Sequence, residues 1–496
     1  MPIEVTAGVE PGWLDQALPG RIWARDRDVF GPGEDDPAER LGWLELPWSM
    51  RGRLEELRAF ATEVAGEAEV VALLGMGGSS LAAEVFSTSL ARRPGHPRLV
   101  VMDSTHPARV LDDTRRLDPA RALFVVSSKS GTTAETLALY RHFAEVTRDP
   151  NRFVAITDPG TPLEQLARVA GFRAVFTNPP DIGGRFSALS LFGLVPAALA
   201  GADLAPLLED AAGLAERTRA AAGNPALLLG AFMAAQTRAG RDKLTVILPA
   251  ALAPFGDWLE QLLAESTGKR GTGVVPICGE PPLPPETYGS DRAFVALGGE
   301  PAAELEKLGR PLATVSADGL GAQMFLWEFA TAVAGSLLGI NPFDQPNVEA
   351  AKRLARRALE GEGTPRWPED DPAELFEGCA PPELAVIGAF ADPSPPHRAV
   401  LAAARARLAT SGVATMAGFG PRYLHSTGQL HKGGPAHLRA LIVLEPPGED
   451  LPIPGERHSF GELIAAQAHG DADALRAAGR RVACTTWQRF EDWVGS

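Results

Sequence analysis

Twice in this chain a short apolar run ends in glycines and hydroxyl residues. The first instance covers residues 70–80 (VVALLGMGGSS) and the second covers residues 122–136 (ALFVVSSKSGTTAET). Each pattern predicts a buried strand, a turn of small residues and the start of a helix. The turns of such units meet at the carboxyl edge of a parallel sheet, where ligands bind in α/β proteins. The two runs therefore predict a binding site at that edge.

Similar apolar runs recur along the chain with helical spacing between them. The strands predicted for a first unit are 70–74, 99–102, 122–126, 153–157 and 174–177. Those predicted for a second unit are 244–248, 273–277, 293–297 and 313–315. A segment rich in Pro, Asp and Glu (361–382) predicts a linker, followed by strands at 385–389, 413–417, 441–444 and 482–485. Helices predicted in the second unit include 258–265, 321–338 and 348–359. We expect an α/β fold whose parallel sheets are covered by helices on both faces.

Length and charge limit what the chain can be. At 496 residues it exceeds one typical core, and we expect three regions: 1–205, with an irregular cover over 1–69, then 206–375 and 376–496. The net charge of -15 argues against general nucleic-acid binding. No apolar run is long enough to span a bilayer and no secretory signal is apparent, so a cytoplasmic location is expected. Three widely spaced cysteines predict neither a disulfide framework nor a zinc site.

Lysine is scarce in this chain. Only six of its 47 basic residues are Lys, and four of the six, Lys129, Lys269, Lys352 and Lys432, lie in or beside motif-like segments. An ammonium and a guanidinium are not interchangeable at a fitted site, so retained lysines are candidates for such positions. Chance retention is the alternative.

The small-residue turns are candidates for a phosphate site. Backbone N–H groups at a helix start, several hydroxyls and one ammonium suit an anion. The candidate residues are Gly77, Gly78, Ser79, Ser128, Lys129, Ser130 and Thr133. The alternative is that the glycines make a tight turn and the hydroxyls cap the next helix. The spacing of a Walker loop is absent, and a single GxGG is too weak to indicate a dinucleotide site.

Two charged residues are candidates for chemistry beside that site. Arg185 follows Gly183 and Gly184, which let the backbone present the guanidinium to a developing oxyanion. Glu265 ends a helical stretch and shares a face with Trp258 and Gln261, where an apolar environment would raise its pKa and suit a general base. The alternatives are a structural arginine in a turn and a surface glutamate near a helix end.

Two later segments also carry candidate residues. Residues 341–352 (NPFDQPNVEAAK) predict a loop and then a helix that holds Lys352, for which a solvated charge is the alternative. His425 and His431 are six residues apart between glycines, which is a poor spacing for a metal site on one helical face. An acid–base histidine is favoured, with a structural histidine as the alternative.

Together, six motifs resemble those of glucose-6-phosphate isomerases of the sugar isomerase superfamily. They are GMGGSS, SSKSGTT, GGRFS, ESTGK, NPFDQPNVEAAK and LHSTGQ, spread over about 75–435. The longer segment FGPRYLHSTGQLHKGGP is similar to the isomerase half of fused transaldolase/glucose-6-phosphate isomerase proteins. A transaldolase barrel would need eight further βα units, for which this chain has no room.

The resemblance implies two doubly wound sugar isomerase (SIS) domains with a C-terminal α/β extension. It also implies reversible isomerisation of glucose 6-phosphate and fructose 6-phosphate through a cis-enediol, a step of glycolysis and gluconeogenesis. Glu265 would shuttle the proton, Arg185 would stabilise the enediolate, and His425 and Lys352 would assist ring opening. Gln345 and Gly184 would lie near the sugar, and the candidate phosphate residues would hold the 6-phosphate. No metal or cofactor is implied. Family members are homodimers that exchange the histidine, so a homodimer is implied.

The chain departs from the common pattern in one respect. In the commoner isomerases the histidine segment precedes the FDQ segment, whereas here His425 follows Lys352, which makes His431 a substitute candidate. The region beyond about 375 is not part of the common core. Two alternatives remain open at this point: an isomerase that also acts on mannose 6-phosphate, and a non-catalytic sugar-phosphate sensor.

Overall fold

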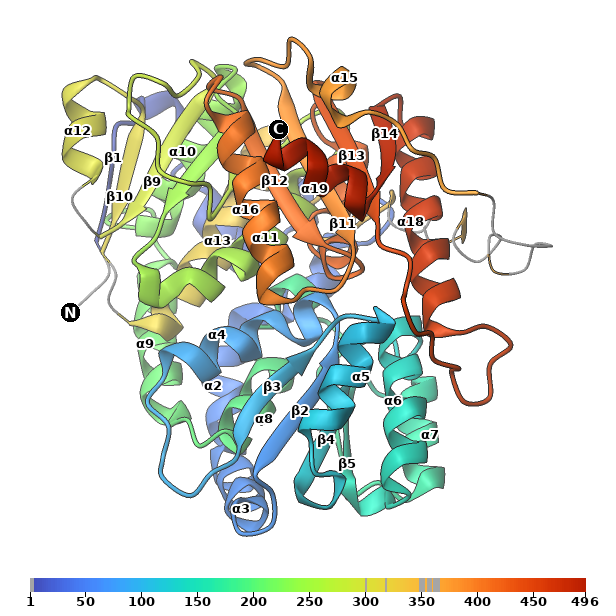
Figure 1. The fold of residues 1–496 in the computed structure, drawn as a ribbon. Coiled ribbons are helices and arrows are strands. Elements are labelled where there is room, and N and C mark those ends of the chain that lie inside the picture. The colour runs from blue at the N-terminus through green and yellow to red at the C-terminus, as the bar shows by residue number, and fades with distance from the viewer. Residues whose placement is uncertain (1–3, 299–300, 317–318, 348–352, 355–358, 360–365) are drawn as a thin grey trace.

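The computed structural model describes residues 4–298, 301–316, 319–347, 353–354, 359 and 366–496. Its strands form three separate sheets (Figure 1). The strands are β1 (Val5–Ala7), β2 (Val70–Gly75), β3 (Arg98–Met102), β4 (Ala122–Ser127), β5 (Phe153–Thr157), β6 (Ala174–Thr177), β7 (Lys243–Ile247), β8 (Val275–Ile277), β9 (Arg292–Leu297), β10 (Leu312–Val315), β11 (Leu384–Phe390), β12 (Ala414–Phe419), β13 (Leu438–Leu444) and β14 (Arg481–Thr486). The expected α/β fold with parallel sheets and a C-terminal α/β extension is confirmed.

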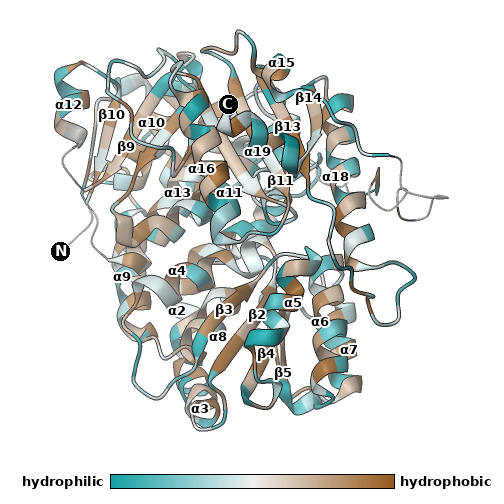
Figure 2. Cartoon of the chain, viewed as in Figure 1, coloured by the Kyte–Doolittle hydropathy of each residue, from teal (hydrophilic) through white to brown (hydrophobic). Residues whose placement is uncertain are grey.

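The first sheet is parallel throughout, in the order β3-β2-β4-β5-β6, and all five of its predicted strands are present. Its central strands β2 and β4 are buried along their whole length, as their unbroken apolar sequences require in a sheet covered on both faces. Figure 2 shows these strands as hydrophobic and the helices around them as mixed. Gly75 pairs with Ser127, so the two small-residue turns leave the sheet at the same edge.

The second sheet has the order β1-β10-β9-β7-β8. Its four predicted strands are present and parallel to one another. Strand β1 was not predicted: it pairs antiparallel with β10, with Val5 opposite Val315. The N-terminal cover therefore begins as an edge strand of the second sheet.

The third sheet is parallel, in the order β12-β11-β13-β14, and contains the four strands predicted after the linker. Part of the predicted linker, residues 366–382, is described and contains the short helix α15. The predicted helix over 348–359 lies largely outside the described residues.

The helices connect the strands and join the sheets. They are α1 (Leu18–Trp23), α2 (Leu46–Ser49), α3 (Leu54–Ala65), α4 (Leu81–Ser89), α5 (Pro107–Arg116), α6 (Ala134–Thr147), α7 (Pro162–Ala170), α8 (Leu191–Leu199), α9 (Leu204–Arg217), α10 (Pro225–Arg238), α11 (Ala253–Thr267), α12 (Pro301–Lys307), α13 (Leu320–Leu338), α15 (Pro372–Phe376), α16 (Pro395–Ala409), α17 (Gly428–Gly433), α18 (Phe460–Ala477) and α19 (Trp487–Gly495). No helix in the described part of the chain is both long and apolar enough to cross a bilayer.

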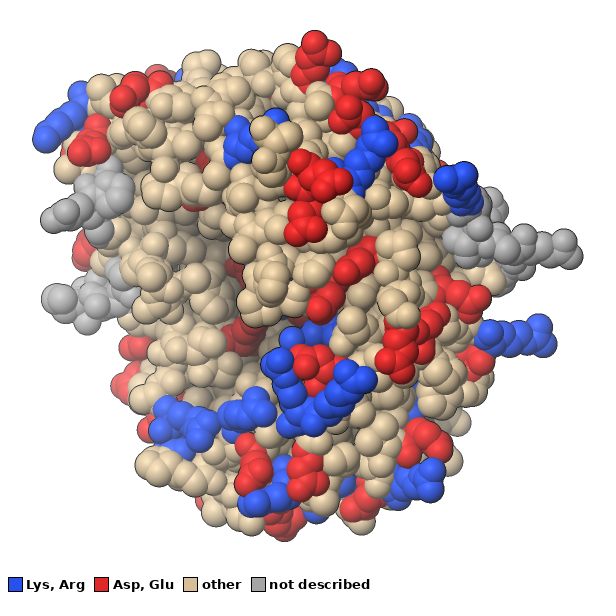
Figure 3. Space-filling view, in the orientation of Figure 1, with Lys and Arg blue, Asp and Glu red and all other residues tan. Residues whose placement is uncertain are grey.

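The three sheets pack against one another rather than standing apart. In Figure 1 the first sheet occupies the lower half, and the second and third lie side by side above it. One apolar core runs from the first sheet into the second, and Phe460 and Leu463 of α18 join the core of the first sheet. On the face drawn in Figure 3, acidic and basic side chains are interspersed among uncharged surface. The region where the three sheets meet contains most of the candidate residues.

Candidate active site

The first small-residue turn, a 3-10 turn over Gly77–Ser79, packs directly on the turn that carries Arg185. A Cβ atom on Gly78 would lie 2.0 Å from the Gly184 carbonyl oxygen, which no side chain could tolerate. Gly77 has a φ of +54°, in the left-handed region that favours glycine. The Ser187 hydroxyl donates to the Gly78 carbonyl over 3.1 Å. The glycines are thus needed to bring the first and third motifs into contact.

The second turn is lined by hydroxyl groups. The Ser128 and Thr133 hydroxyls lie 2.8 Å apart, and the Gly131 N–H donates to the Ser128 oxygen over 3.1 Å. The exposed Ser130 hydroxyl lies 2.9 Å from that of Thr132. This loop can present hydroxyl and N–H donors to an anion from the start of α6.

Lys129 has an acidic partner that was not singled out from the sequence. Its ammonium forms an ion pair with Asp158 and donates to the Pro180 carbonyl over 3.4 Å. Burial raises the pKa of Asp158, and the hydrogen bond from Lys129 opposes this effect. Asp158 directly follows β5, so its place at the carboxyl edge of a predicted strand was the available signal. An incoming anion would meet a lysine that already has a partner.

The Arg185 guanidinium is buried and bonded on several sides. Its Nε donates to the Ser266 hydroxyl over 2.9 Å, and its Nη2 donates to the carbonyls of Pro342 (2.6 Å) and Asp344 (2.8 Å). Its Nη1 lies 3.5 Å from Glu265 Oε2. Burial lowers the pKa of Arg185, while the charges of Glu265 and Asp344 oppose this effect. The structure therefore brings together the two charged residues singled out from separate motifs.

Glu265 lies in the last turn of α11, and its side chain is only 6% exposed. Gln261, one turn earlier, has its Nε2 atom 3.5 Å from Glu265 Oε2 and donates to the His425 carbonyl over 2.6 Å. The helical face predicted from the sequence is therefore the face turned to the site. Through Gln261 it also contacts the histidine segment.

His425 ends the 3-10 turn Arg422–His425 and reaches the first sheet from the third unit. Its Nε2 lies 2.8 Å from Glu135 Oε1, which also accepts a hydrogen bond from Gln467 Nε2 over 2.6 Å. Glu135 lies in the first turn of α6, two residues after Thr133, and was not singled out because an acid at a helix start has an ordinary role there. A buried carboxylate beside a histidine fixes the orientation of its ring.

His431 lies elsewhere. It is buried on α17, with its ring 6.1 Å from that of Tyr423. Burial and the neighbouring Lys432 lower the pKa of His431 to about 3, so its ring is neutral at physiological pH. Of the two histidines, His425 is the one whose segment contacts Gln261.

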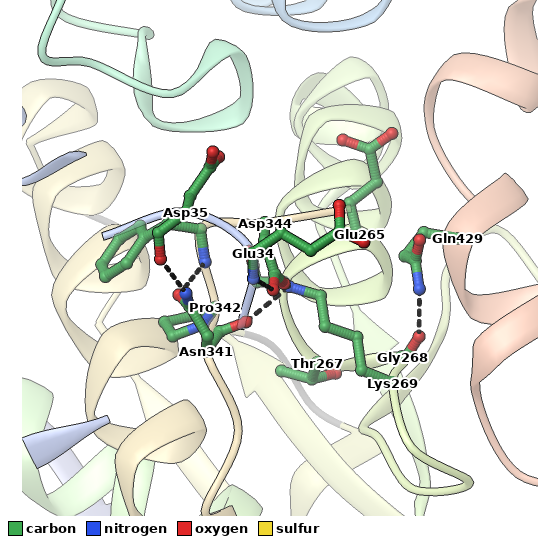
Figure 4. A network of polar contacts seen from close by, with 12 residues as sticks. Glu34, Asp35, Glu265, Thr267, Gly268, Lys269, Asn341, Pro342, Asp344 and Gln429 are labelled. Atoms are coloured by element: carbon green, nitrogen blue, oxygen red, sulfur yellow. Dashed lines mark hydrogen bonds and ion pairs between the residues drawn. The ribbon is translucent and has the colours of Figure 1, made fainter. Parts of the chain in front are cut away.

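A second buried cation, Lys269, reaches Asp344 and Asn341 (Figure 4), and the charges of Arg185 and Glu265 also act on it. Its Nζ lies 2.8 Å from Asp344 Oδ1 and donates to the Asn341 carbonyl over 2.6 Å. Burial and the nearby Arg185 charge lower the pKa of Lys269 to about 7, whereas Asp344 and Glu265 raise it. Lys269 was a candidate because lysine is scarce in this chain, but the sequence did not indicate its contact with Asp344.

The loop after α13 carries the remaining candidates. Gln345 follows the buried Asp344 and is exposed. Lys352 lies outside the described residues, so its position cannot be compared with the prediction.

The N-terminal cover packs against Asn341 and Asp344 of this network. The Glu34 N–H donates to Asp344 Oδ2 over 3.1 Å, and Asn341 Nδ2 donates to the Asp35 carbonyl over 2.9 Å. A Cβ atom on Gly33 would lie 2.2 Å from Asp344 Oδ2, so the cover fits tightly against the loop. The cover thus contributes to the burial of Asn341 and Asp344.

Comparison with known proteins identifies the family. The family described as phosphoglucose isomerase matches residues 49–275. The glucose-6-phosphate isomerase of Rubrobacter xylanophilus is 31% identical, with 71% of this chain and 95% of that protein covered. The chain belongs to the glucose-6-phosphate isomerase family. A Thermus thermophilus glucose-6-phosphate isomerase is 32% identical, with 68% of this chain and 94% of that protein covered.

Solved structures agree with this glucose-6-phosphate isomerase assignment at the level of fold. A hypothetical protein of Thermus thermophilus matches with a TM-score of 0.63 and 26% identity, over 72% of this chain and 100% of its own. A glucose-6-phosphate isomerase of Chlamydia trachomatis matches with a TM-score of 0.54 and 20% identity, over 69% of this chain and 77% of its own. As a member of this family, the chain is an isomerase.

In this glucose-6-phosphate isomerase family member, an ionic network holds the histidine segment against the other two units. Arg422, three residues before His425, contacts Asp103 (2.5 Å), Glu84 (2.7 Å) and Asp257 (2.8 Å). These carboxylates come from the end of β3, from α4 and from α11. All three units therefore meet at Arg422.

Proposed function

We propose that the chain interconverts glucose 6-phosphate and fructose 6-phosphate through a cis-enediol intermediate. The observation that carries this proposal is the buried contact between Glu265 and Arg185, 3.5 Å apart, next to the sheet edge that bears the hydroxyl-rich turn. A carboxylate and a fixed cation side by side suit proton abstraction next to a carbonyl.

In the proposed reaction Glu265 takes the proton from C2 of the open-chain aldose. The electron pair of that C–H bond forms the C1=C2 double bond, and the carbonyl oxygen at C1 gains the negative charge. Arg185 stabilises this enediolate. A proton then moves from the C2 hydroxyl to the C1 oxygen, and Glu265 returns its proton to C1, which leaves a ketone at C2. The same steps in reverse give the aldose.

Ring opening is assigned to His425. Its contact with Glu135 supports this role, because an imidazole held by a carboxylate can carry a proton between the ring oxygen and the anomeric hydroxyl. Lys352 and Gln345 remain predictions of the resemblance, as helpers in ring opening and sugar binding.

The 6-phosphate is assigned to the two small-residue turns of the first sheet. The proposed binding groups are the backbone of Gly77 and Gly78 and the side chains of Ser79, Ser128, Lys129, Ser130 and Thr133, while Gly184 would lie near the sugar. Backbone N–H groups at the start of α6 favour an anion there. The phosphate would hold the sugar so that its C1–C2 end meets Glu265.

We also propose that each chain supplies His425 to its own site. Support comes from three contacts of its own third unit: the His425 ring with Glu135, the His425 carbonyl with Gln261, and Arg422 with Asp257. A homodimer stays a prediction of the resemblance, and in this proposal the dimer does not exchange His425.

We propose the cytoplasm as the site of action. Support comes from Cys278, Cys379 and Cys484, which are all free and buried, as is usual for proteins of a reducing compartment.

A non-catalytic sensor is the less favoured function. A sensor needs the phosphate-binding turns but has no use for a carboxylate and a guanidinium held together in a buried site. Both are present here. Activity on mannose 6-phosphate is likewise not favoured by any contact described above.

A coupled assay tests the proposal. Fructose 6-phosphate should be converted to glucose 6-phosphate, detected by a dehydrogenase specific for glucose 6-phosphate, in buffer treated with a chelator. Glu265→Gln should lower kcat by about 10³-fold with little change in substrate binding. Glu260→Gln on the same helix is the matched control and should retain activity, because a glutamine can still accept the Cys278 N–H. An inactive wild-type chain, or near-normal turnover in Glu265→Gln, contradicts the proposal.

A further inference from the structure

Two buried cations lie near the Glu265 carboxylate, and the mechanism above uses only Arg185. The second, Lys269, belongs to the loop that follows α11, four residues after Glu265. The charges of both Arg185 and Glu265 act on the Lys269 ammonium, which places the three groups in one electrostatic network. In a water-excluded site such interactions are stronger than at a surface.

Asp344 connects the two cations. Its Oδ1 lies 2.8 Å from the Lys269 ammonium, and its backbone carbonyl accepts from Arg185 Nη2 over 2.8 Å. The two cations also hold neighbouring carbonyls of the same loop, Asn341 by Lys269 and Pro342 by Arg185, each over 2.6 Å. Lys269 holds Asn341 and Asp344 of this loop (Figure 4). The position of Arg185 therefore depends on a loop that Lys269 holds in place.

The backbone around Lys269 is itself held by the third unit. Gln429 Nε2 donates to the Gly268 carbonyl over 3.0 Å and to Asn347 Oδ1 over 2.8 Å. A Cβ atom on Gly268 would lie 2.4 Å from the Leu430 Cα atom, so α17 packs directly on this turn. Helix α17 therefore contacts both the backbone beside Lys269 and the 341–347 loop.

We propose that Lys269 and Asp344 are positioning residues for the isomerisation: their ion pair holds Arg185 at Glu265 and balances the charge around that carboxylate. When Glu265 takes up the substrate proton, the network gains one positive charge as the enediolate gains one negative charge. Loss of Lys269 would remove that excess of positive charge. This inference rests on the isomerisation proposed above.

The pH–rate profile separates this role from simple structural support. Arg185 contacts Glu265 directly, and the charges of Glu265 and Lys269 act on each other. Asp344 acts on both cations, Asp35 acts on Arg185, and the His425 carbonyl meets Glu265 through Gln261. Lys269→Met removes a cation, which disfavours the ionised carboxylate, so the acid limb of kcat/KM should move up by about one pH unit. Asp344→Asn removes an anion and should move the same limb down.

Turnover provides a second readout. Lys269→Met should lower kcat by about tenfold or more, because Arg185 loses its fixed position, while KM for fructose 6-phosphate changes by less than about threefold. Lys269→Arg should restore part of the charge effect but not the fit, since a guanidinium does not replace a compact ammonium between Asp344 and Asn341.

A double variant and a matched lysine variant distinguish the charge effect from a loss of stability. Lys269→Met leaves a buried carboxylate unpaired, so Lys269→Met/Asp344→Asn removes both charges and should bring the acid limb back to within about 0.3 pH unit of wild type. Lys243, at the start of β7, is equally buried and contacts Asp242 (2.7 Å) and the Pro382 carbonyl (2.7 Å). Lys243→Met should cost similar thermal stability and leave the limb unchanged.

The outcomes are distinct. No isomerase activity in the wild-type chain overturns the proposed function itself. An active wild type whose two single variants, folded by circular dichroism, show no limb shift or shifts in the same direction overturns the positioning role alone.

Discussion

The two ends of the candidate site are built differently. The phosphate end, at the edge of the first sheet, is only partly buried: Ser128 is buried, but Ser130 and Thr132 are exposed. Lys129 is partly exposed and forms an ion pair with Asp158. The reacting end, where Arg185 and Glu265 meet, is buried and receives bonds from several parts of the chain. A phosphate-binding site near solvent binds and releases an anion at a modest free-energy cost. A buried network of charges instead resists any movement of its side chains.

This contrast predicts where substitutions act. Changes at the buried end should reduce kcat strongly, because charges in a dry, preorganised site contribute most in the transition state. Changes at the exposed end should act mainly on KM, because solvent screens those charges and they bind substrate and transition state alike.

After Glu265→Gln, the largest effect is expected at Arg185. Arg185→Lys keeps one positive charge but cannot make the bonds to Ser266, Pro342 and Asp344 from one nitrogen. We expect kcat to fall by about 10²–10³-fold with KM changed far less, measured by steady-state kinetics in both directions. Near-normal kcat would mean that the buried end does not depend on this geometry.

A smaller effect is expected at the histidine pair. His425→Ala should lower kcat by about 10²-fold, since it removes the proton carrier. Glu135→Gln keeps a hydrogen-bond acceptor but loses the charge, so a loss of about tenfold is expected, with a change in the pH–rate profile. Equal losses in both variants would contradict the proposal that Glu135 acts only through His425. An unchanged pH–rate profile in Glu135→Gln would show that Glu135 does not influence the proton carried by His425.

Local pattern explains why the sheets could be predicted. Strands such as β2 and β4 are unbroken apolar runs that end in glycine or serine, and such runs have few other stable environments. Strand β1 could not be predicted, because it has only three residues and its partner β10 lies about 300 residues away. Its pairing depends on the folded edge of the second sheet rather than on its own sequence.

The site was predicted only in part for the same reason. Arg185, Glu265 and His425 stood out in their own motifs, but their contacts arise from three units that the sequence does not place in space. Glu135 and Asp158 were missed because an acid after a strand or at a helix start is ordinary until a basic partner lies across from it. The exposed Gln345 shows that a residue in a motif can lie at the rim of the site.

At the exposed end, Lys129→Met should raise KM for fructose 6-phosphate by about tenfold and leave kcat within about twofold. The same variant should weaken competitive inhibition by inorganic phosphate by a similar factor, because only the phosphate-binding end of the site has changed. Lys307→Met, at an exposed lysine of α12, is the control and should change neither constant. A large loss of kcat with unchanged KM would place Lys129 at the reacting end and erase the contrast.

The smallest effect is expected at Asp158. The direction of the change in KM there distinguishes the exposed end of the site from the buried end. At the buried end, removal of a carboxylate would leave a cation without its partner and harm activity. Beside the partly exposed Lys129, Asp158→Asn should instead free the ammonium for the substrate, and KM and the inhibition constant for phosphate should fall by about threefold or less. Asp118→Asn, at an exposed cap before β4, retains its capping oxygen and should change neither value. A rise in KM for Asp158→Asn would instead show that this ion pair, like the Lys269–Asp344 pair, holds its cation in the geometry that binding requires.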